Sequence, residues 1–339
     1  EIINHLKTFD DQGECHQRIL SLSQEDRLVL IVSGRCGRQL VPQIHHLRQV
    51  SSIYVYCMDK KANELWTKDF TKIKSVIGEL KDIIHVIRQD QQSRVKIEEP
   101  LSINLLNGNF VHSLLLIDVL IRMKSIESDK QQLIQLCKKE YENNQKELVF
   151  VGEFEKDYRS DKALWWYTRD TFLYKMLNKA LRVQNIDLLF LLRFVIGDIY
   201  QQLKLYQQQS PIRVFRGQVI SIDELDTLRQ SINNLISINS FFSTSTNHQK
   251  AVGFLNSTEI TSDLCRVLFV IDADPQEVKS KPFADISSLS DFDNESEVLF
   301  MIGSIFRLTK IEETKDKDIV TIYMELCGDD EHDLKELFD

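Results

Sequence analysis

Three short segments in the second half of the chain hold side chains suited to chemistry on a charged substrate. Arg216 ends a β-rich run and is followed by Gly217. Residues 243–245 form a Ser-Thr-Ser run, and two carboxylates, Glu295 and Glu297, stand one residue apart where another β-rich run begins. A guanidinium forms paired hydrogen bonds with a phosphate. A fixed carboxylate stabilises positive charge that develops during a reaction.

Each segment has an ordinary structural interpretation when it is taken alone. An arginine such as Arg216 most often makes a surface or structural ion pair, and a Ser-Thr-Ser run usually forms a turn or an edge strand. Glu295 and Glu297 alone would be two solvated carboxylates. Residues i and i+2 of an extended segment face the same side, so these carboxylates can also point into one cleft. The order of the segments and the residues around them decide between the interpretations.

Residues outside these segments extend the pattern. In a helical stretch, a Trp-Tyr-Thr run at 166–168 precedes a tyrosine, an asparagine and an arginine that one helix can carry, at Tyr174, Asn178 and Arg182. An aromatic residue, Phe254, follows Ser243 by eleven positions, and a Pro-Phe-Ala-Asp-Ile-Ser run at 282–287 precedes the two glutamates.

Together, these residues resemble the R-S-E class of mono-ADP-ribosyltransferases, which includes the eukaryotic arginine-specific enzymes and several bacterial toxins. The resemblance covers roughly residues 145–326 and none of residues 1–105. It implies an NAD(P)⁺–protein-arginine ADP-ribosyltransferase, a glycosyltransferase with NAD as co-substrate. The implied acceptor is an arginine side chain of an unidentified protein, and nicotinamide is released.

The resemblance also implies the roles of the residues that would act on NAD. Arg216 is expected to hold the nicotinamide-side phosphate and ribose. Because Gly217 has no side chain, its backbone is expected to approach the carboxamide of nicotinamide. Glu297 is expected to stabilise the oxocarbenium-like sugar that forms when the glycosidic bond breaks, and Ser243 to orient Glu297. The other expected NAD contacts are Thr244, Ser245, Phe254 against the nicotinamide, Tyr167, Thr168, Tyr174 and Asn178.

The acceptor side of the site follows from the same resemblance. An arginine is almost always protonated and is a poor nucleophile, so Glu295 is expected to hold and activate it. Phe292 is expected to contact the protein substrate. The loop 289–294 is acidic, which suits a basic acceptor and equally suits an ordinary solvated loop. An NAD glycohydrolase and a catalytically weak NAD-binding or interaction module are the alternatives, and the complete set of site residues argues against the second.

The composition limits the partners. A length of 339 residues suggests two or three domains, and 42% hydrophobic residues are enough for their cores. The formal net charge of −9 disfavours nucleic-acid binding. No run of about 20 apolar residues occurs, so we expect a cytoplasmic protein without a membrane partner. Six scattered cysteines without a CxxC pair predict free thiols and no metal site.

The hydrophobic pattern predicts an α/β N-terminal domain over residues 1–105, small and Rossmann-like or receiver-like, whose role the sequence does not indicate. Its predicted strands are 28–32, 53–57 and 73–77, with a helix over 38–49. Residues 101–106 are also strand-like and could complete its sheet. The glycine-containing run 33–38 forms either an ordinary turn or a phosphate-binding turn.

Residues 106–339 are predicted to form an α+β ADP-ribosyltransferase domain. A helical lobe occupies about 111–208, and a strand-rich catalytic part occupies about 211–326. The resemblance implies that the strands form two packed β-sheets around an NAD cleft. A single strand is expected over residues 236–242.

Overall fold

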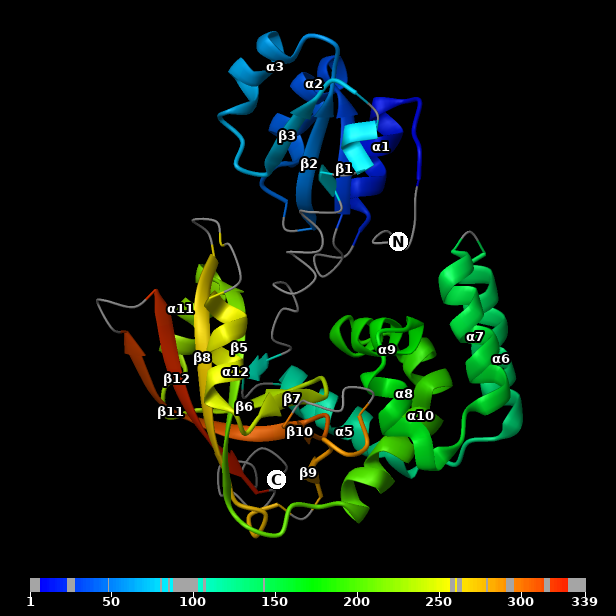
Figure 1. The fold of residues 1–339 in the computed structure, drawn as a ribbon, viewed down its shortest axis with the longest axis vertical. Helices are drawn as coiled ribbons and strands as arrows, with labels where there is room; N and C mark the ends of the chain where they lie inside the picture. Colours follow the sequence, from blue (N-terminus) through cyan, green and yellow to red (C-terminus); the bar gives the residue numbers. More distant parts are fainter. Residues whose placement is uncertain are drawn as a thin grey trace. The chain divides into compact units, whose positions relative to one another are not determined.

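The computed structural model describes residues 7–22, 28–47, 49–79, 81–84, 86–87, 103–105, 108–142, 144–256, 260, 264–278, 280–290, 296–313 and 318–328. The chain separates into two compact units, Glu1–Val95 and Lys96–Asp339 (Figure 1). Across the described ranges, no helix combines the length and the apolar character needed to cross a bilayer.

The first unit is a three-stranded parallel sheet in the order β1-β2-β3, formed by β1 (Leu28–Ser33), β2 (Val50–Tyr56) and β3 (Ile73–Ile77). One face packs against residues of α1 (Gln12–Leu20), α2 (Gly34–Ile44) and α3 (Lys60–Thr67). On the other face, Ile83 and Ile87 from a helical segment pack near Tyr54 and Ile77. The predicted α/β class is therefore confirmed for this unit.

The glycine-containing run after β1 lies inside α2. Ser33 caps the helix by accepting a hydrogen bond from the Cys36 N–H (3.2 Å), so α2 begins at Gly34 rather than at the predicted residue 38. A Cβ atom on Gly34 would lie 2.7 Å from Asn63 Oδ1, and one on Gly37 would lie 3.0 Å from Val32 Cγ2. Close packing of α2 on its neighbours therefore accounts for both glycines.

The first strand of the second unit was expected to belong to the sheet of the first unit. Residues 103–105 form β4 (Ile103–Leu105), which pairs antiparallel with β6 (Leu235–Ile238). The expectation that residues 101–106 complete the first sheet is therefore wrong. This strand is too short for its pattern to identify its partner.

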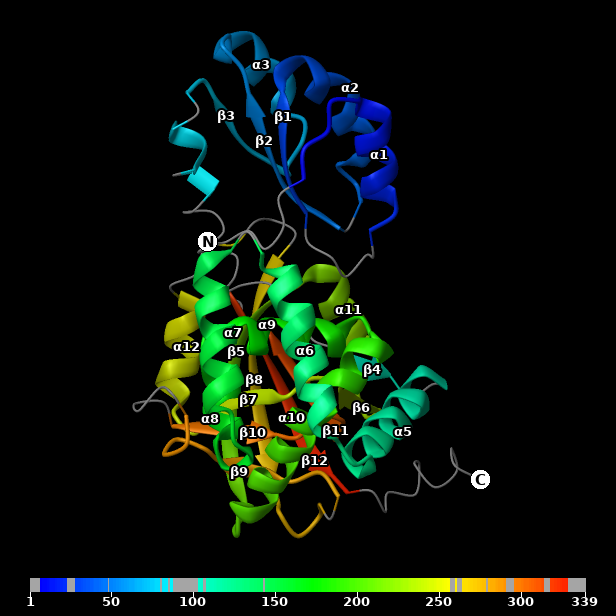
Figure 2. The ribbon, with the colours of Figure 1, turned by 90° about the vertical axis from the view of Figure 1, so that its right-hand side faces the viewer.

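The helical lobe follows β4, as predicted. Its helices pack around α10, whose residues Leu192, Val195, Ile196 and Ile199 are fully buried. The lobe lies against one side of the sheet (Figures 1 and 2), and sheet residues such as Leu299 enter its core. The helices are α5 (Gly108–Arg122), α6 (Glu127–Glu140), α7 (Gln145–Asp157), α8 (Ala163–Thr168), α9 (Phe172–Arg182) and α10 (Ile186–Leu205).

The strands of the second unit form one nine-stranded sheet in the order β4-β6-β11-β12-β8-β5-β7-β10-β9. β12 and β8 are parallel, and the other pairs are antiparallel. The remaining strands are β5 (Ile212–Ser221), β7 (Phe242–Ser245), β8 (Leu264–Ala273), β9 (Phe283–Asp285), β10 (Glu297–Phe300), β11 (Ser304–Glu313) and β12 (Ile319–Cys327).

The single strand predicted over residues 236–242 is two strands. β6 ends at Ile238 and β7 begins at Phe242, yet four strands separate them in the sheet order. The strands near one end of the sheet, β6 and β11, therefore lie close to β7 and β10 near the other end. The Phe306 ring of β11 lies 5.9 Å from Phe242 of β7 and 5.5 Å from Phe300 of β10. The two packed layers are thus parts of one hydrogen-bonded sheet that folds over a shared core.

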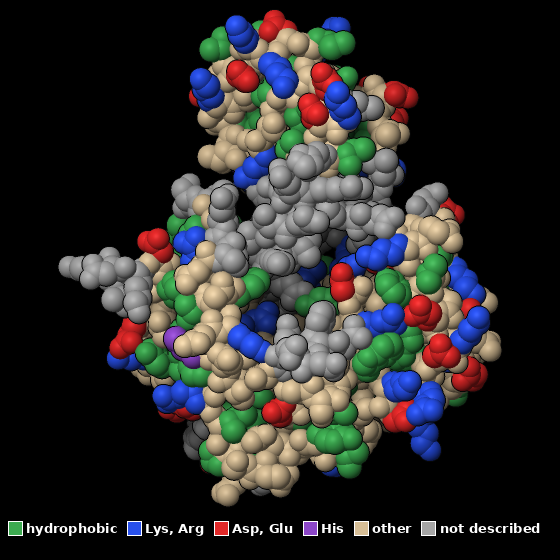
Figure 3. All heavy atoms as spheres, viewed as in Figure 1, with side chains coloured by type: hydrophobic (Ala, Val, Ile, Leu, Met, Phe, Trp, Pro, Cys, Tyr) green, Lys and Arg blue, Asp and Glu red, His purple; other side chains and the backbone are tan. Residues whose placement is uncertain are grey.

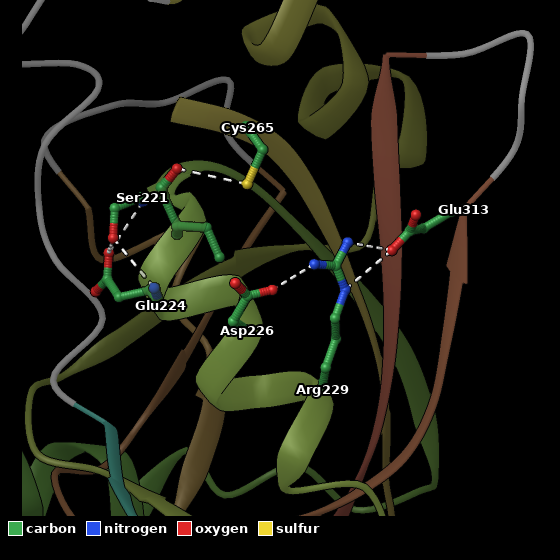
Figure 4. A network of polar contacts seen from close by, with 7 residues as sticks. Ser221, Glu224, Asp226, Arg229, Cys265 and Glu313 are labelled. Atoms are coloured by element: carbon green, nitrogen blue, oxygen red, sulfur yellow. Dashed lines mark hydrogen bonds and ion pairs between the residues drawn. The ribbon is translucent and has the colours of Figure 1, made fainter. Parts of the chain in front are cut away.

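Two helices that the hydrophobic pattern does not predict lie among these strands, α11 (Ile222–Gln230) and α12 (His248–Asn256). Ser221 and Glu224 form a capping box at the start of α11, in which each side chain accepts a hydrogen bond from the other residue's backbone N–H (3.2 and 3.1 Å). Near its end, Arg229 bridges Asp226 and Glu313 (Figure 4). The Arg229–Glu313 contact joins the end of α11 to β11.

Candidate active site

The three segments that carry the predicted chemistry lie on neighbouring strands. In the sheet, β7 lies between β5 and β10. The register pairs Phe215 with Ser245, and Ser245 with Glu297. Strand pairing therefore brings Arg216, Ser243 and Glu297 together, although they are far apart in the sequence.

Ser243 connects the cation and the carboxylate of this site. Its Oγ donates a hydrogen bond to Glu297 Oε1 (2.5 Å), and its carbonyl oxygen accepts one from Arg216 Nη1 (2.7 Å). Arg216 Nε donates to Gln218 Oε1 (3.1 Å), and the guanidinium carbon lies 5.2 Å from the centre of the Phe242 ring. These contacts fix both charged groups before any ligand binds.

The two charged groups differ in their contact with solvent. Glu297 is 8% exposed, whereas Arg216 is only partly buried. A buried carboxylate interacts strongly with nearby positive charge, because little water screens it. The site can therefore bind an anion at Arg216 and stabilise a developing cation near Glu297.

The other hydroxyl residues of the run have different contacts. Thr244 is buried, and its Oγ1 donates to the Val298 carbonyl (2.8 Å), which joins β7 to β10. Ser245 Oγ accepts from the Asn247 N–H (3.1 Å) just before α12. Because side chains alternate along a strand, Ser243 and Ser245 share one face and Thr244 lies on the other.

Gly217 allows α12 to approach β5 closely. A Cβ atom there would lie 2.2 Å from the Ala251 carbonyl oxygen and 2.9 Å from Leu255 Cγ. Phe254 of the same helix is partly buried and packs against the apolar cluster of Ala251, Leu255 and neighbouring β5 and β8 residues. Gly217 therefore sets the position of the helix that carries Phe254.

We expect Gly217→Ala to lower the free energy of unfolding by about 1–3 kcal/mol, because overpacking forces the helix and the strand apart. Urea unfolding measures this change. Gly253→Ala is the matched control, since a Cβ atom at Gly253 of α12 meets nothing within 4 Å. Alanine there should leave stability unchanged or raise it by up to about 1 kcal/mol. Equal effects of the two substitutions would contradict the packing argument.

The predicted residues of the helical lobe form a cluster at α8 and α9. The Tyr167 hydroxyl donates to Asn178 Oδ1 (3.2 Å), and its ring centre lies 5.5 Å from that of Tyr174. The same ring lies 4.8 Å from Phe241, which directly precedes β7. Thr168 Oγ1 donates to the Trp165 carbonyl (3.2 Å). The Tyr167–Phe241 contact thus connects the lobe to the strand that carries Ser243.

Lys175 follows Tyr174 on α9, and its ammonium group pairs with Glu147. Burial alone would lower the pKa of Lys175, but the hydrogen bond and the charge of Glu147, whose Oε1 lies 2.9 Å away, raise it above its usual value. Figure 3 shows further Lys and Arg side chains over the lobe, mixed with Asp and Glu. The lobe has exposed ion pairs, such as Lys138–Glu155 (2.7 Å).

Two predicted acceptor-side residues, Glu295 and Phe292, lie outside the described residues. Gln218 and Ser287 contact the site without having been assigned a role from the sequence. Gln218 stands two positions after Arg216, so strand alternation alone could have placed both side chains on one face. Ser287 and Glu297 are ten residues apart and do not share a strand, so strand alternation could not have predicted their contact.

No group of three or more His, Cys, Asp or Glu residues suited to a metal ion occurs within the described ranges. The six cysteines are free thiols, as predicted. Burial raises the pKa of Cys137 to about 12 and is the main cause that raises that of Cys265 to about 11. Both therefore stay protonated at neutral pH.

The sequence matches no family model and no curated protein. The structure is similar to known ADP-ribosyltransferases. The Vis toxin, an ADP-ribosyltransferase from Vibrio splendidus, is 22% identical, and the match covers 62% of this chain and 91% of that one with a TM-score of 0.39. HopU1 from Pseudomonas syringae is 15% identical over 60% of this chain and 99% of that one, with a TM-score of 0.41.

A third similar structure is an ADP-ribosyltransferase from Clostridium botulinum. It is 13% identical, and the match covers 61% of this chain and 98% of that one with a TM-score of 0.39. Because the identities and TM-scores are low, these comparisons show similarity of fold alone, over about 60% of the chain. Any assignment of substrate and of catalytic residues therefore depends on the side chains of the site itself.

Proposed function

We propose that this chain is an NAD-dependent mono-ADP-ribosyltransferase that transfers ADP-ribose to an arginine side chain of a protein and releases nicotinamide. The supporting observation is the hydrogen-bonded series Arg216–Ser243–Glu297 across three adjacent strands. It combines a phosphate-binding cation with a buried carboxylate, and the resemblance of the sequence to the R-S-E class assigns the same three residues to this chemistry.

In this proposal, each side chain has a separate task. Arg216 binds the phosphate and ribose next to nicotinamide, where its planar guanidinium forms paired hydrogen bonds. Glu297 stabilises the positive charge on the sugar as the C–N bond to nicotinamide breaks. Ser243 orients Glu297 by donating to its carboxylate. The aromatic residues Tyr167, Tyr174 and Phe254 are proposed to contact NAD.

Glu295 is proposed to select the acceptor. A carboxylate two residues before Glu297 would hold the guanidinium of the incoming arginine and help to remove its proton. Water needs no such group, so hydrolysis of NAD by the same site is the alternative function. The two reactions consume NAD equally and differ in the product.

We therefore expect Glu295→Gln to abolish transfer to an arginine analogue such as agmatine while NAD hydrolysis continues at a similar rate. Labelled NAD incubated with and without agmatine separates the two products. Glu64→Gln, an exposed substitution in the first unit, is the matched control and should change neither reaction. If Glu295→Gln still modifies agmatine at the wild-type rate, the arginine assignment is wrong.

A further inference from the structure

Gln218 lies beside Arg216 on an otherwise apolar face of β5. Residues i and i+2 of a strand face the same side, so Arg216 and Gln218 share this face with Val214 and Ile220. Val214 and Ile220 are buried in the core of the sheet, and Gln218 itself is only 5% exposed. A buried amide costs free energy unless it forms hydrogen bonds. The contact of Gln218 with Arg216 supplies such a bond.

The Gln218 amide orients the guanidinium of Arg216. Its Oε1 accepts a hydrogen bond from Arg216 Nε (3.1 Å), and the Ser243 carbonyl accepts one from Nη1 (2.7 Å). A guanidinium is planar and only donates hydrogen bonds, so acceptors at two of its nitrogens determine the plane in which it lies. The Phe242 ring, 5.2 Å from the guanidinium carbon, packs against the same group. Gln218 is therefore one of the groups that set the direction of this cation.

The acceptor that Gln218 offers to Arg216 is neutral. A glutamate has the same shape and could accept the same hydrogen bond, but its negative charge would compete with a bound phosphate for the guanidinium. Such competition is strong where apolar side chains keep water away. Phe269 and Val267, the β8 residues paired with these two positions, are both fully buried. An amide at position 218 thus orients the cation and adds no negative charge beside it.

We propose that Gln218 is a positioning residue that directs Arg216 at the pyrophosphate of NAD without neutralising it. This inference rests on the proposed function, in which Arg216 binds the phosphate next to nicotinamide. Gln218 then acts on the binding of NAD and not on the bond that breaks. Substitutions at Gln218 should therefore raise KM for NAD and leave kcat nearly unchanged.

Two substitutions separate the charge of this side chain from its hydrogen bond. Gln218→Glu keeps the shape and the acceptor and adds a negative charge, whereas Gln218→Met keeps a similar length and removes the acceptor. The matched control is Gln201→Glu, which adds the same charge at an exposed position of α10. Steady-state release of nicotinamide gives KM and kcat for NAD. Calorimetric titration gives the Kd of ADP-ribose, which has the pyrophosphate but lacks the bond to nicotinamide, and thermal unfolding gives Tm.

We expect Gln218→Glu to raise both KM for NAD and the Kd of ADP-ribose by about ten- to hundredfold, the range for one hydrogen bond to a charged group. Gln218→Met should raise them by less, about tenfold, and should lower Tm more, because it leaves Arg216 Nε without this acceptor. The control should match the wild type. A merely structural role predicts the reverse order of affinities, because glutamate preserves the hydrogen bond and methionine does not.

Tighter binding of ADP-ribose by Gln218→Glu than by Gln218→Met would overturn the inference, as would wild-type affinity in either variant. If only one variant folds, its KM for NAD decides, and a wild-type value counts against the inference. Loss of the fold in both variants would also overturn it, because the amide would then serve the fold alone.

The wild-type chain separates this inference from the proposed function. If it neither binds ADP-ribose nor releases nicotinamide from NAD, the proposed function fails, and the role of Gln218 fails with it. If the wild type is active and Gln218→Glu keeps the wild-type KM, only the role of Gln218 is wrong.

Discussion

Glu297→Gln is expected to lower kcat for nicotinamide release from NAD by about 10²–10³-fold, whether arginine or water accepts the ADP-ribose. Removing one key electrostatic group from an active site costs about 2.7–4 kcal/mol of transition-state stabilisation. Glutamine keeps the size of the side chain, and its amide oxygen can still accept the Ser243 hydroxyl hydrogen bond. The substitution therefore removes the charge and leaves the packing.

Steady-state release of nicotinamide measures the effect, and Glu325→Gln is the matched control. Glu325 is an exposed glutamate on β12, so its amide variant should turn over NAD like the wild type. Thermal unfolding of both variants checks that the fold is intact. Activity of Glu297→Gln within a few-fold of the wild type would exclude Glu297 as the catalytic carboxylate.

The second large effect concerns the helical lobe. Asp129→Ala is expected to lower the free energy of unfolding by about 3–5 kcal/mol, the cost of breaking a buried ion pair by removing one partner. Asp129 Oδ2 contacts Arg193 Nη2, and the two side chains are only 5% and 4% exposed. The same oxygen accepts the Ile126 N–H (2.7 Å) at the start of α6. Without Asp129, the buried guanidinium would lose its carboxylate partner, while its contacts with the Phe190 and Lys124 carbonyl oxygens and with the Phe190 ring carry no compensating charge.

Chemical denaturation measures this loss, and Asp118→Ala is the matched control. Asp118 pairs with Arg122 (2.9 Å) on the surface of α5, where the side chains are 45% and 77% exposed. Exposed pairs contribute about 0–1 kcal/mol. The double variant Asp129→Leu/Arg193→Met should recover part of the stability, because it buries no unpaired charge. Equal destabilisation by Asp129→Ala and Asp118→Ala would refute the argument.

Hydrophobic patterns predicted most of the elements that position the site. The part predicted to be strand-rich, about 211–326, contains β5, β8, β11 and β12, and the predicted helical lobe over about 111–208 contains most of α5 and all of α6 to α10. The prediction failed at residues 236–242, which were expected to form one strand. Two adjacent polar residues, Asn239 and Ser240, stand where β6 ends, and the chain then leaves β6 for β7, which four strands separate from it in the sheet. The partner of a strand is a non-local property that its own residues do not encode.

The candidate site was predicted unevenly for a related reason. Arg216, Ser243 and Glu297 could be selected by type and order, and the structure brings them together. Their geometry depends on the register of β5, β7 and β10, which the sequence alone does not show. α11 was overlooked although its Ser221–Glu224 capping box is visible in the sequence. The contact between Ser287 and Glu297 could not be found without the fold.

The order of the sheet has a consequence for a chain that is still being synthesised. The strands that flank β7 lie on either side of it in the sequence, and β10 is among the last strands of the unit to leave the ribosome. A nascent chain that ends before residue 297 holds the guanidinium and the hydroxyl but lacks the carboxylate. Such non-local pairing forms late in folding. Under the proposed function, a chain therefore gains its catalytic carboxylate only after nearly the whole unit has been made.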